Sequence, residues 1–508
     1  MADPEESPLV AERRAKVERL RARGVEPYPW AFPGRVPSSD VRAACAGLAP
    51  GAEASGPVLR VAGRVRAIRA HGRSAFVDLV DGAGELQLLL RTDELGEEAY
   101  RGWLADLDPG DLLGADGTPL VTRKGEPTLR ATALTLLAKA LAPPPEKYHG
   151  LKDPEERIRR RHVDLLASAE SRNRFAARSL LVRELRRFLD AAGFLEVETN
   201  TLSRTASGAA AEPFRTRANY VDDELLLRIS LELQLKRILV GGLERVYEIG
   251  RVFRNEDLDS THSPEFTLLE LYWAYADYGD MRGLVESLYA TLAGHLVARY
   301  PDAPFARAAA AAFTPPFATV DWVEALEARS GRPGIAELSR EQLRALAREA
   351  GTTVPDDSPA GKFLEKLFEH YVEPTLDRPT FVLDFPTATT PLAKRHRSKP
   401  GRVERFELFY RGIELANAYS ELNDPDEQER RLVEQVGGRA GDHVSHDPEF
   451  VEALRFGMPP AAGLGIGIDR LVMALLDVAS IKDVILFPLV RGRPPAGPAR
   501  DPAAPSAP

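Results

Sequence analysis

The sequence has a single cysteine, Cys45, among its 508 residues. No disulfide can therefore form within the chain, and without a Cys-x-x-Cys pair we expect no structural zinc site. The sequence also lacks a run of about 18 or more apolar residues, which a membrane-spanning helix would need. The first residues, Met1–Glu6, are acidic, whereas a signal peptide begins with basic and then apolar residues. We therefore expect a cytoplasmic protein that does not associate with membranes.

The chain has no excess of positive charge either. Its 67 basic and 76 acidic residues give a formal net charge of −9, which argues against a protein that coats nucleic acid nonspecifically. Basic residues still cluster locally, at 60–73 and at 157–162. A solvated surface is the simpler explanation of each cluster taken alone. The hydrophobic content of 44% and charged content of 28% are those of a globular protein, not of a fibrous or disordered one.

The pattern of helical and β-like segments changes along the chain and predicts an α+β protein. A helix is expected at 9–23, and five short β-like runs favour a closed five-stranded barrel of the OB-fold type. The prolines Pro143–Pro145 interrupt regular structure and place the main boundary just after them. The expected segments are an N-terminal helix with an irregular connector at 1–56, the barrel at 57–148, a larger mixed domain at 149–490 and a disordered Pro- and Ala-rich tail at 491–508.

Two strand-like runs joined by a polar loop predict a charged pocket in the larger domain. The first run ends in Phe253–Glu256, and the second extends from Glu265 to Tyr272. Because side chains on a strand alternate between its faces, Arg254 and Glu256 are expected to share one face. Buried ionised groups are costly unless they are paired or face a ligand. A salt-bridge ladder on an exposed sheet is the alternative, and this segment alone leaves both open. The returning strand places four side chains on one face, namely Phe266, Leu268, Glu270 and Tyr272.

The segment 404–421 predicts a hairpin that carries paired carboxylates. A turn at Arg411-Gly412 would pair Phe409 with Glu414 and Glu407 with Ala416, so that Glu407 and Glu414 lie diagonally on one face. Two such carboxylates repel each other unless a divalent cation neutralises them, and Mg²⁺ commonly binds one or two carboxylates plus substrate phosphates. A solvated sheet edge is the alternative for this pair. Three further side chains can enter the same site only if a bulge falls near Leu415 or Ala416, namely Asn417, Tyr419 and Glu421.

A glycine-rich strand, 463–468, predicts a flat binding surface. Its Leu464, Ile466 and Ile468 would face the core, while three alternating glycines leave only backbone on the other face. Arg470 follows where the pattern becomes helical, so its guanidinium could lie over a base or contact a phosphate. The spacing is G-x-G-x-G, so it does not fit a dinucleotide-binding fingerprint.

Taken in this order, the segments resemble the signature motifs of class II aminoacyl-tRNA synthetases, and among these the lysyl-tRNA synthetases of the bacterial type. Residues 193–199 resemble motif 1, 253–272 motif 2 and 463–470 motif 3, and 146–165 resemble the hinge of this family. The stretches 270–278 and 420–424 are similar to the lysine enzymes rather than the aspartyl or asparaginyl ones. The resemblance covers about 58–489.

The resemblance implies a fold and a reaction. The barrel would bind the anticodon, and the larger domain would be an antiparallel sheet flanked by helices. The enzyme would use ATP to convert L-lysine to lysyl-adenylate and then transfer the lysyl group to the 3′ end of lysine tRNA. It would need Mg²⁺ but no zinc, and it would act as a homodimer.

The resemblance also implies a role for individual residues. Arg254 and Arg470 would be catalytic. The ATP site would comprise Arg254, Glu256, His262, Phe266 and Arg470, and Mg²⁺ would lie on Glu407 and Glu414. The lysine site would comprise Gly208 and Glu232 at the α-amino group, Glu270, Tyr272 and Glu421 at the ε-ammonium group, and Asn417 and Tyr419 as walls. The anticodon would be read by Arg69, Phe76, Gln87 and Glu126, although a core position is an alternative for Phe76.

The sequence departs from the family pattern at several positions. Asn200 replaces the proline that normally ends motif 1, and Leu231 replaces the proline that commonly precedes the α-amino-binding glutamate. Glu212 stands where a basic residue is usual, and 216–219 lack the usual histidines. We expect these changes to surround the lysine pocket and to bear on dimerisation and on amino-acid specificity.

Two other functions remain open from the sequence. One is a ligase that attaches lysine or β-lysine to a protein acceptor such as an elongation factor; such enzymes lack the barrel. The other is a catalytically silent regulatory relative, against which the retention of Arg254, Glu407, Glu414 and Arg470 argues.

Overall fold

The computed structural model of the chain consists of two compact units, Met1–Lys152 and Asp153–Pro508. It describes residues 7–144, 151, 153–205, 208, 211–219, 224–390, 392–437 and 447–491. Residues 146–150 and 152 of the expected hinge at 146–165, and nearly all of the expected tail at 491–508, lie outside the described residues. Within the described ranges, no helix combines the length and the apolar character needed to cross a membrane.

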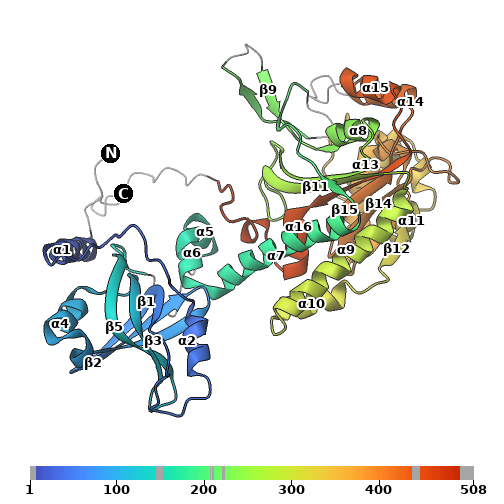
Figure 1. Cartoon of the computed structure of the whole chain (residues 1–508). Coiled ribbons are helices and arrows are strands. Elements are labelled where there is room, and N and C mark those ends of the chain that lie inside the picture. Colours follow the sequence, from blue (N-terminus) through green and yellow to red (C-terminus); the bar gives the residue numbers. More distant parts are fainter. Residues whose placement is uncertain are drawn as a thin grey trace, which may run out of the picture. The chain divides into compact units, whose positions relative to one another are not determined.

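The first unit is built on a closed barrel of five strands, as predicted (Figure 1). Inward-facing side chains such as Ala75, Val77 and Leu79 form its core and are at most 2% exposed. The same alternation puts Phe76 on the outer face, where it is half-buried, so the alternative of a core position for Phe76 is wrong. The strands, in the barrel order β1-β2-β3-β5-β4, are β1 Leu59–His71, β2 Ser74–Asp81, β3 Gly84–Arg91, β5 Pro127–Ala138 and β4 Leu112–Val121.

A short helix interrupts the segment that was expected to be an irregular connector. Ser38–Cys45 forms α2, whose Val41 and Cys45 pack into the barrel core. Asp81 accepts hydrogen bonds from the backbone N–H and the hydroxyl of Ser38, at 2.8 and 2.7 Å, and so supports the start of this helix. That support comes from a strand far along the chain, so the local composition does not reveal it. The other helices of this unit are α1 Pro8–Ala22, α3 Thr92–Leu95 and α4 Glu97–Asp106.

The second unit contains an eight-stranded sheet in the order β12-β13-β14-β15-β16-β11-β10-β6. The pairs are antiparallel except at the two edges, where β12 pairs with β13 and β10 with β6 in parallel. The strands of this sheet are β6 Leu195–Glu196, β10 Arg245–Phe253, β11 Glu265–Ala274, β12 Ala318–Asp321, β13 Thr380–Leu383, β14 Arg405–Tyr410, β15 Ile413–Ser420 and β16 Ala461–Gly467. A separate small sheet consists of β7 Leu202–Ser203, β9 Glu224–Leu227 and β8 Arg215–Arg217.

Four helices pack against one face of the large sheet (Figure 1), whereas α8 Glu232–Val240 and the helical segment between β12 and β13 cover parts of the other face. The main core joins apolar residues of α7, α9, α10 and α16 to alternate residues of the sheet, such as Leu269, Leu271 and Ile466. The intervening residues of the same strands therefore point away from these helices. The four helices are α7 Ala169–Ala191, α9 Tyr278–Arg299, α10 Pro304–Ala312 and α16 Ile468–Leu476.

A helical segment between β12 and β13 has a core of its own, in which Trp322 stacks on Phe368 with ring centroids 4.7 Å apart. It contains α11 Trp322–Ser330, η1 Ile335–Glu337, α12 Arg340–Glu349, α13 Ala360–Tyr371 and η2 Glu373–Thr375. The remaining elements of this unit are α5 Pro154–Arg159, α6 Arg161–Ala167, α8 Glu232–Val240, η3 Thr387–Thr389, α14 Pro425–Gly437, α15 Pro448–Arg455 and η4 Ile481–Asp483.

Candidate active site

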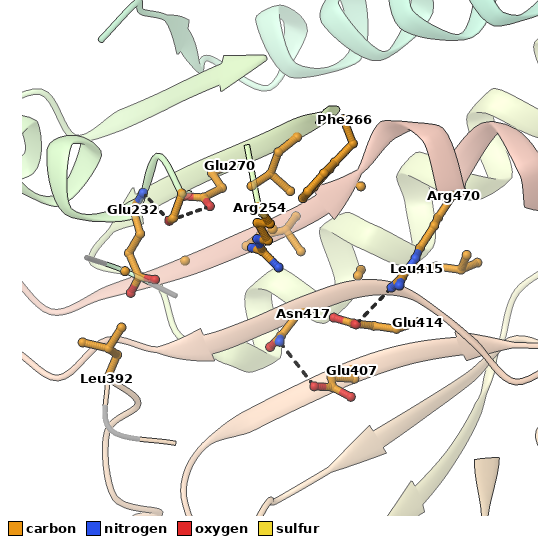
Figure 2. A pocket seen from close by; sticks show the side chains of 18 of the residues that line it. Glu232, Arg254, Phe266, Glu270, Leu392, Glu407, Glu414, Leu415, Asn417 and Arg470 are labelled. Carbon is orange, nitrogen blue, oxygen red and sulfur yellow. Dashed lines mark hydrogen bonds and ion pairs between the residues drawn. The ribbon is translucent and has the colours of Figure 1, made fainter. Parts of the chain in front are cut away.

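A cavity of about 520 Å³ lies on the face of the large sheet opposite to α7, α9, α10 and α16 (Figure 2). Side chains from β11, β14, β15 and β16 and from the loop after β10 line it. The structure brings to this lining all the residues that we predicted for ATP, lysine and Mg²⁺, with the exception of Glu421. The glycines Gly463, Gly465 and Gly467 form part of it, as the prediction of a bare strand face requires.

The loop after β10 places Arg254 in the middle of the cavity (Figure 2). The strand ends at Phe253, so Arg254 and Glu256 do not share a strand face as expected; they follow the strand and still line the cavity. The Arg254 Nε donates a hydrogen bond to the backbone oxygen of Ile229 at 3.2 Å, and its guanidinium lies 5.2 Å from the centroid of the Phe266 ring. A guanidinium held in this way can bind phosphate or carboxylate oxygens.

A second arginine lies at the beginning of α16. The Arg470 Nη1 is 3.3 Å from Glu414 Oε2, and its Nη2 is 2.9 Å from His262 Nε2. Asp469, which is buried, anchors this end of the helix by accepting hydrogen bonds from the backbone N–H of Thr267 at 2.9 Å and from Arg178 at 2.6 Å. Contacts with β11 and α7 therefore fix the position of Arg470.

A bulge in β15 brings the carboxylates of the hairpin and Asn417 to the same face (Figure 2). Phe409 pairs with Glu414 as predicted, but Glu407 pairs with Asn417 rather than with Ala416. The register shifts because Leu415 is an extra residue between Glu414 and Ala416, at the place where a bulge was needed. The Asn417 Nδ2 consequently lies 3.3 Å from Glu407 Oε1.

The carboxylates of this hairpin suit a divalent cation. Burial raises the pKa of Glu407; Arg405, 2.5 Å away, opposes this, and repulsion by Glu414 and Glu373 adds to it. A cation would relieve the repulsion. The described residues contain no cluster of three or more His, Cys, Asp or Glu side chains arranged to hold a metal ion. Two carboxylates fit Mg²⁺ if substrate phosphates and water complete its ligands.

The other end of the cavity is acidic and largely buried. The hydroxyl of Ser230 donates to Glu270 Oε1 at 3.0 Å, whereas Glu270 Oε2 is buried without a hydrogen-bond partner (Figure 2). Burial, and after it repulsion by Glu232, raises the pKa of Glu270 to about 8. Tyr419 donates its hydroxyl to Glu232 Oε1 at 2.6 Å. This end of the cavity therefore suits a ligand group that carries positive charge.

Two glycines allow close approaches in this acidic pocket. A Cβ on Gly208, whose φ is +87°, would lie 2.9 Å from the Ser230 hydroxyl. A Cβ on Gly463 would lie 2.0 Å from Glu421 Oε1. We expected Glu421 in the lining, but it is buried and outside the described lining; its Oε1 occupies the space that a side chain on Gly463 would take, beside the lining residue Tyr272.

Sequence reasoning missed a residue behind the pocket. Lys236 has no exposed side-chain surface, and its Nζ lies 2.7 Å from Glu232 and 2.5 Å from Glu421. The Glu-x-x-x-Lys spacing of Glu232 and Lys236 on a helix was visible in the sequence, but such pairs are usually exposed.

The departures from the family pattern lie outside the described cavity lining, although Leu231 stands between the lining residues Ser230 and Glu232. The Asn200 side chain donates to the backbone oxygen of Leu202 at 2.6 Å, so it stabilises the turn in which the family has proline. Leu231 is fully buried just before α8, and Glu212 is exposed.

The residues predicted to read the anticodon form a patch on the outer face of the barrel. Arg69 pairs with Phe76 across β1 and β2, and Gln87 lies on the neighbouring β3. The Thr128 hydroxyl donates to Gln87 Oε1 at 3.2 Å and to the backbone oxygen of Glu126 at 3.1 Å. The structure thus brings the four residues to adjacent strands and a turn.

Comparisons with known protein families agree with the two units. Residues 153–491 match the family described as tRNA synthetases class II (D, K and N). Residues 59–137 match the family described as an OB-fold nucleic acid binding domain.

The chain is also similar over nearly its full length to curated bacterial proteins named lysine–tRNA ligase. The protein from Moorella thermoacetica is 45% identical over 493 residues, which cover 96% of this chain and 98% of the relative. The protein from Deinococcus radiodurans is 47% identical over 497 residues, covering 94% and 93%. The protein from Roseiflexus castenholzii is 46% identical over 491 residues, covering 96% and 99%.

Proposed function

The chain belongs to the class II tRNA synthetases (D, K and N), and we infer that it activates L-lysine with ATP and transfers the lysyl group to the 3′ end of lysine tRNA. The first step forms lysyl-adenylate and releases pyrophosphate. In the second step a terminal ribose hydroxyl of the tRNA takes the lysyl group and AMP leaves. We assign the barrel, 57–148, to anticodon binding and 149–490 to catalysis.

The observation that carries this function is the acidic pocket beside Arg254. L-Lysine has two ammonium groups and one carboxylate, so its site needs an excess of acid and a cation at one end. Glu232 and Glu270 line this pocket, Glu421 lies buried against the lining residue Gly463, and Glu270 Oε2 is buried without a partner. A buried carboxylate in that state is costly unless a ligand cation binds to it.

Within this pocket each group has a proposed task. Gly208 and Glu232 hold the α-amino group, because the glycine permits the backbone to pass beside Ser230. Glu270, Tyr272 and Glu421 surround the ε-ammonium group. Asn417 and Tyr419 form the walls.

At the nucleotide end, charge neutralisation and positioning account for most of the catalysis. Arg254 bridges the α-phosphate and the lysine carboxylate, so it aligns the attacking oxygen with the phosphorus and withdraws charge as pyrophosphate leaves. His262 and Arg470 hold the γ-phosphate end. Phe266 and Arg470 enclose adenine, and Glu256 binds its amino edge.

Glu407 and Glu414 would hold Mg²⁺, which neutralises phosphate charge when it is bound. Arg405 contributes a fixed positive charge beside Glu407, at 2.5 Å, and so restrains that carboxylate in the absence of substrate.

The barrel supplies the argument for a tRNA acceptor rather than a protein acceptor. Its outer patch exposes Arg69 beside the half-buried Phe76, and an aromatic ring with neighbouring polar groups is the usual means by which such barrels bind unpaired bases. Gln87 and Glu126 would read base edges. A ligase acting on an elongation factor would have no use for this patch.

We further propose that the enzyme is a cytoplasmic homodimer. The edge strand β6 and the following segment expose Leu195 and Leu202, with 52% and 46% of their surface accessible. A second copy of the chain would cover these side chains. Light scattering coupled to size exclusion measures the mass directly, and a monomer at micromolar concentration would contradict the proposal.

Pyrophosphate exchange with all twenty amino acids, ornithine and β-lysine tests the amino-acid specificity. We expect exchange with lysine and about 10–200-fold weaker exchange with ornithine, because a missing methylene changes binding only modestly. Aminoacylation of lysine tRNA tests the acceptor. Exchange without charging would exclude the tRNA-charging function, and absence of both would indicate a silent relative.

A further inference from the structure

A lysine side chain lies behind the wall of the amino-acid pocket. Lys236 is on α8, one turn after Glu232, and its Nζ contacts Glu232 Oε1 at 2.7 Å and Glu421 Oε2 at 2.5 Å. The side chain is fully buried and is not part of the described cavity lining. It therefore cannot touch a substrate, and it acts on one only through the two carboxylates.

The surroundings of Lys236 favour its charged form. The rings of Tyr419 and Phe450 lie 5.6 and 5.8 Å from Nζ, at distances suited to cation–π attraction. Burial alone would lower the pKa of Lys236, but attraction by Glu232 and Glu421 outweighs burial and raises the pKa. The side chain is thus a permanent cation over the working pH range.

Lys236 also determines which oxygen of Glu421 is available. Glu421 Oε2 lies 2.5 Å from the lysine Nζ as an ion pair, whereas Oε1 lies against Gly463 and has no such charged partner. Gly463 lines the cavity. Glu421 Oε1 consequently faces the side from which an ε-ammonium group would arrive.

The count of charges in the pocket explains why a buried lysine would lie beside these carboxylates. Three carboxylates, Glu232, Glu270 and Glu421, would exceed the two ammonium groups of lysine by one, and Lys236 removes that excess. We propose that Lys236 is a positioning residue for lysine activation, an internal cation that orients Glu232 and Glu421 and balances the charge of one carboxylate, so that the pocket matches a diammonium amino acid. This inference rests on the proposed function.

The pH dependence of kcat/KM for lysine separates this role from simple packing. The groups that face Glu421 are Lys236 and Glu232 from α8, Glu270 and Tyr272 from β11, and Tyr419 from β15. Burial raises the pKa of Glu421, and Lys236 opposes that rise. Loss of the lysine charge raises the pKa further, so ionised carboxylate would be present only at higher pH.

The experiment uses Lys236→Met, Lys236→Arg and the exposed control Lys362→Met in pyrophosphate exchange between pH 6 and 9. In Lys236→Met we expect KM for lysine at pH 7 to rise about 100-fold, because a buried ion pair loses one partner. The acid limb of kcat/KM should move up by about one pH unit or more, with KM for ATP within about threefold of wild type. In Lys236→Arg and in Lys362→Met, the acid limb of kcat/KM should stay at the pH of the wild-type enzyme.

If kcat/KM for lysine in Lys236→Met falls by the same factor at all pH values, the inference is overturned and a packing role remains. The same holds if KM for ATP rises as much as KM for lysine. If Lys236→Met does not fold, Lys236→Arg decides. An acid limb of kcat/KM that is displaced in this variant, although the positive charge is retained, would also overturn the inference. Wild-type exchange with lysine tests the proposed function separately, so failure of the one is distinguishable from failure of the other.

Discussion

Replacing Glu270 with glutamine separates the stability cost of the acidic pocket from its use in binding. Glu270 is 7% exposed; its Oε1 accepts a hydrogen bond from the Ser230 hydroxyl, the Leu231 backbone also donates to the carboxyl group, and Oε2 is buried without a partner. Glutamine has nearly the same shape and can keep the bond from Ser230, but it carries no charge. We expect Glu270→Gln to raise the free energy of unfolding of the unliganded protein and to abolish lysine-dependent pyrophosphate exchange.

The pKa of Glu270 gives the size and the pH range of this effect. Burial and repulsion by Glu232 raise it from 4.5 to about 8 in the folded protein. A carboxyl group whose pKa is raised on folding contributes its full stability below pH 4.5, and this contribution is lost as the pH rises from 4.5 through 8. At pH 7, 2.5 units above the ordinary pKa of 4.5, the stability lost is at most about 3.5 kcal/mol, at about 1.4 kcal/mol per pH unit. Because relaxation of the site reduces the penalty, we expect a gain of about 1–3 kcal/mol for the variant.

Urea-induced unfolding at pH 5, 6, 7 and 8 measures this difference between variant and wild type. The difference should be small at pH 5 and should increase up to pH 8. Glu265→Gln is the matched control on the same strand; its side chain is 46% exposed, and we expect a change within about 0.5 kcal/mol at every pH. Saturating lysine should stabilise the wild type but not Glu270→Gln. A variant that is no more stable at pH 8 than at pH 5, relative to wild type, would refute the reasoning.

Lysine binding at pH 7 should release protons, because an ammonium group lowers the raised pKa of Glu270. Calorimetry in buffers of different ionisation enthalpy measures this release. A binding enthalpy that does not depend on the buffer would contradict it. Glu407→Gln should raise the Mg²⁺ concentration needed for half-maximal exchange by about tenfold or more, and a titration identical to wild type would exclude a metal-ligand role. Asp469→Asn should raise KM for ATP more than KM for lysine, since Asp469 anchors the start of α16; equal changes would indicate general destabilisation. Phe76→Ala should leave pyrophosphate exchange unchanged and raise KM for tRNA by roughly 5–150-fold, the value of one base stacked on an aromatic ring, and an unchanged KM for tRNA would place the anticodon elsewhere.

The alternation of side chains along single strands was predictable from the sequence. The barrel was expected from its five short runs, and Phe266, Glu270 and Tyr272 do share the cavity face of β11. These features depend only on a period of two within a strand, which neighbouring residues determine. The same local logic required a bulge near Leu415, without saying how the pairing would adjust around it.

Contacts between distant segments decided the rest. The register of β2 in the barrel, not its composition, turned Phe76 outward. The shifted pairing moved Glu407 opposite Asn417, and the missing side chain of Gly463 left the space that Glu421 Oε1 occupies. Lys236 looked like an ordinary member of a helical ion pair, and it became a buried cation only because Glu421, 185 positions later in the chain, packs against the same helix. Which polar groups are removed from water depends on how far-apart elements pack, and that information is not contained in any local pattern.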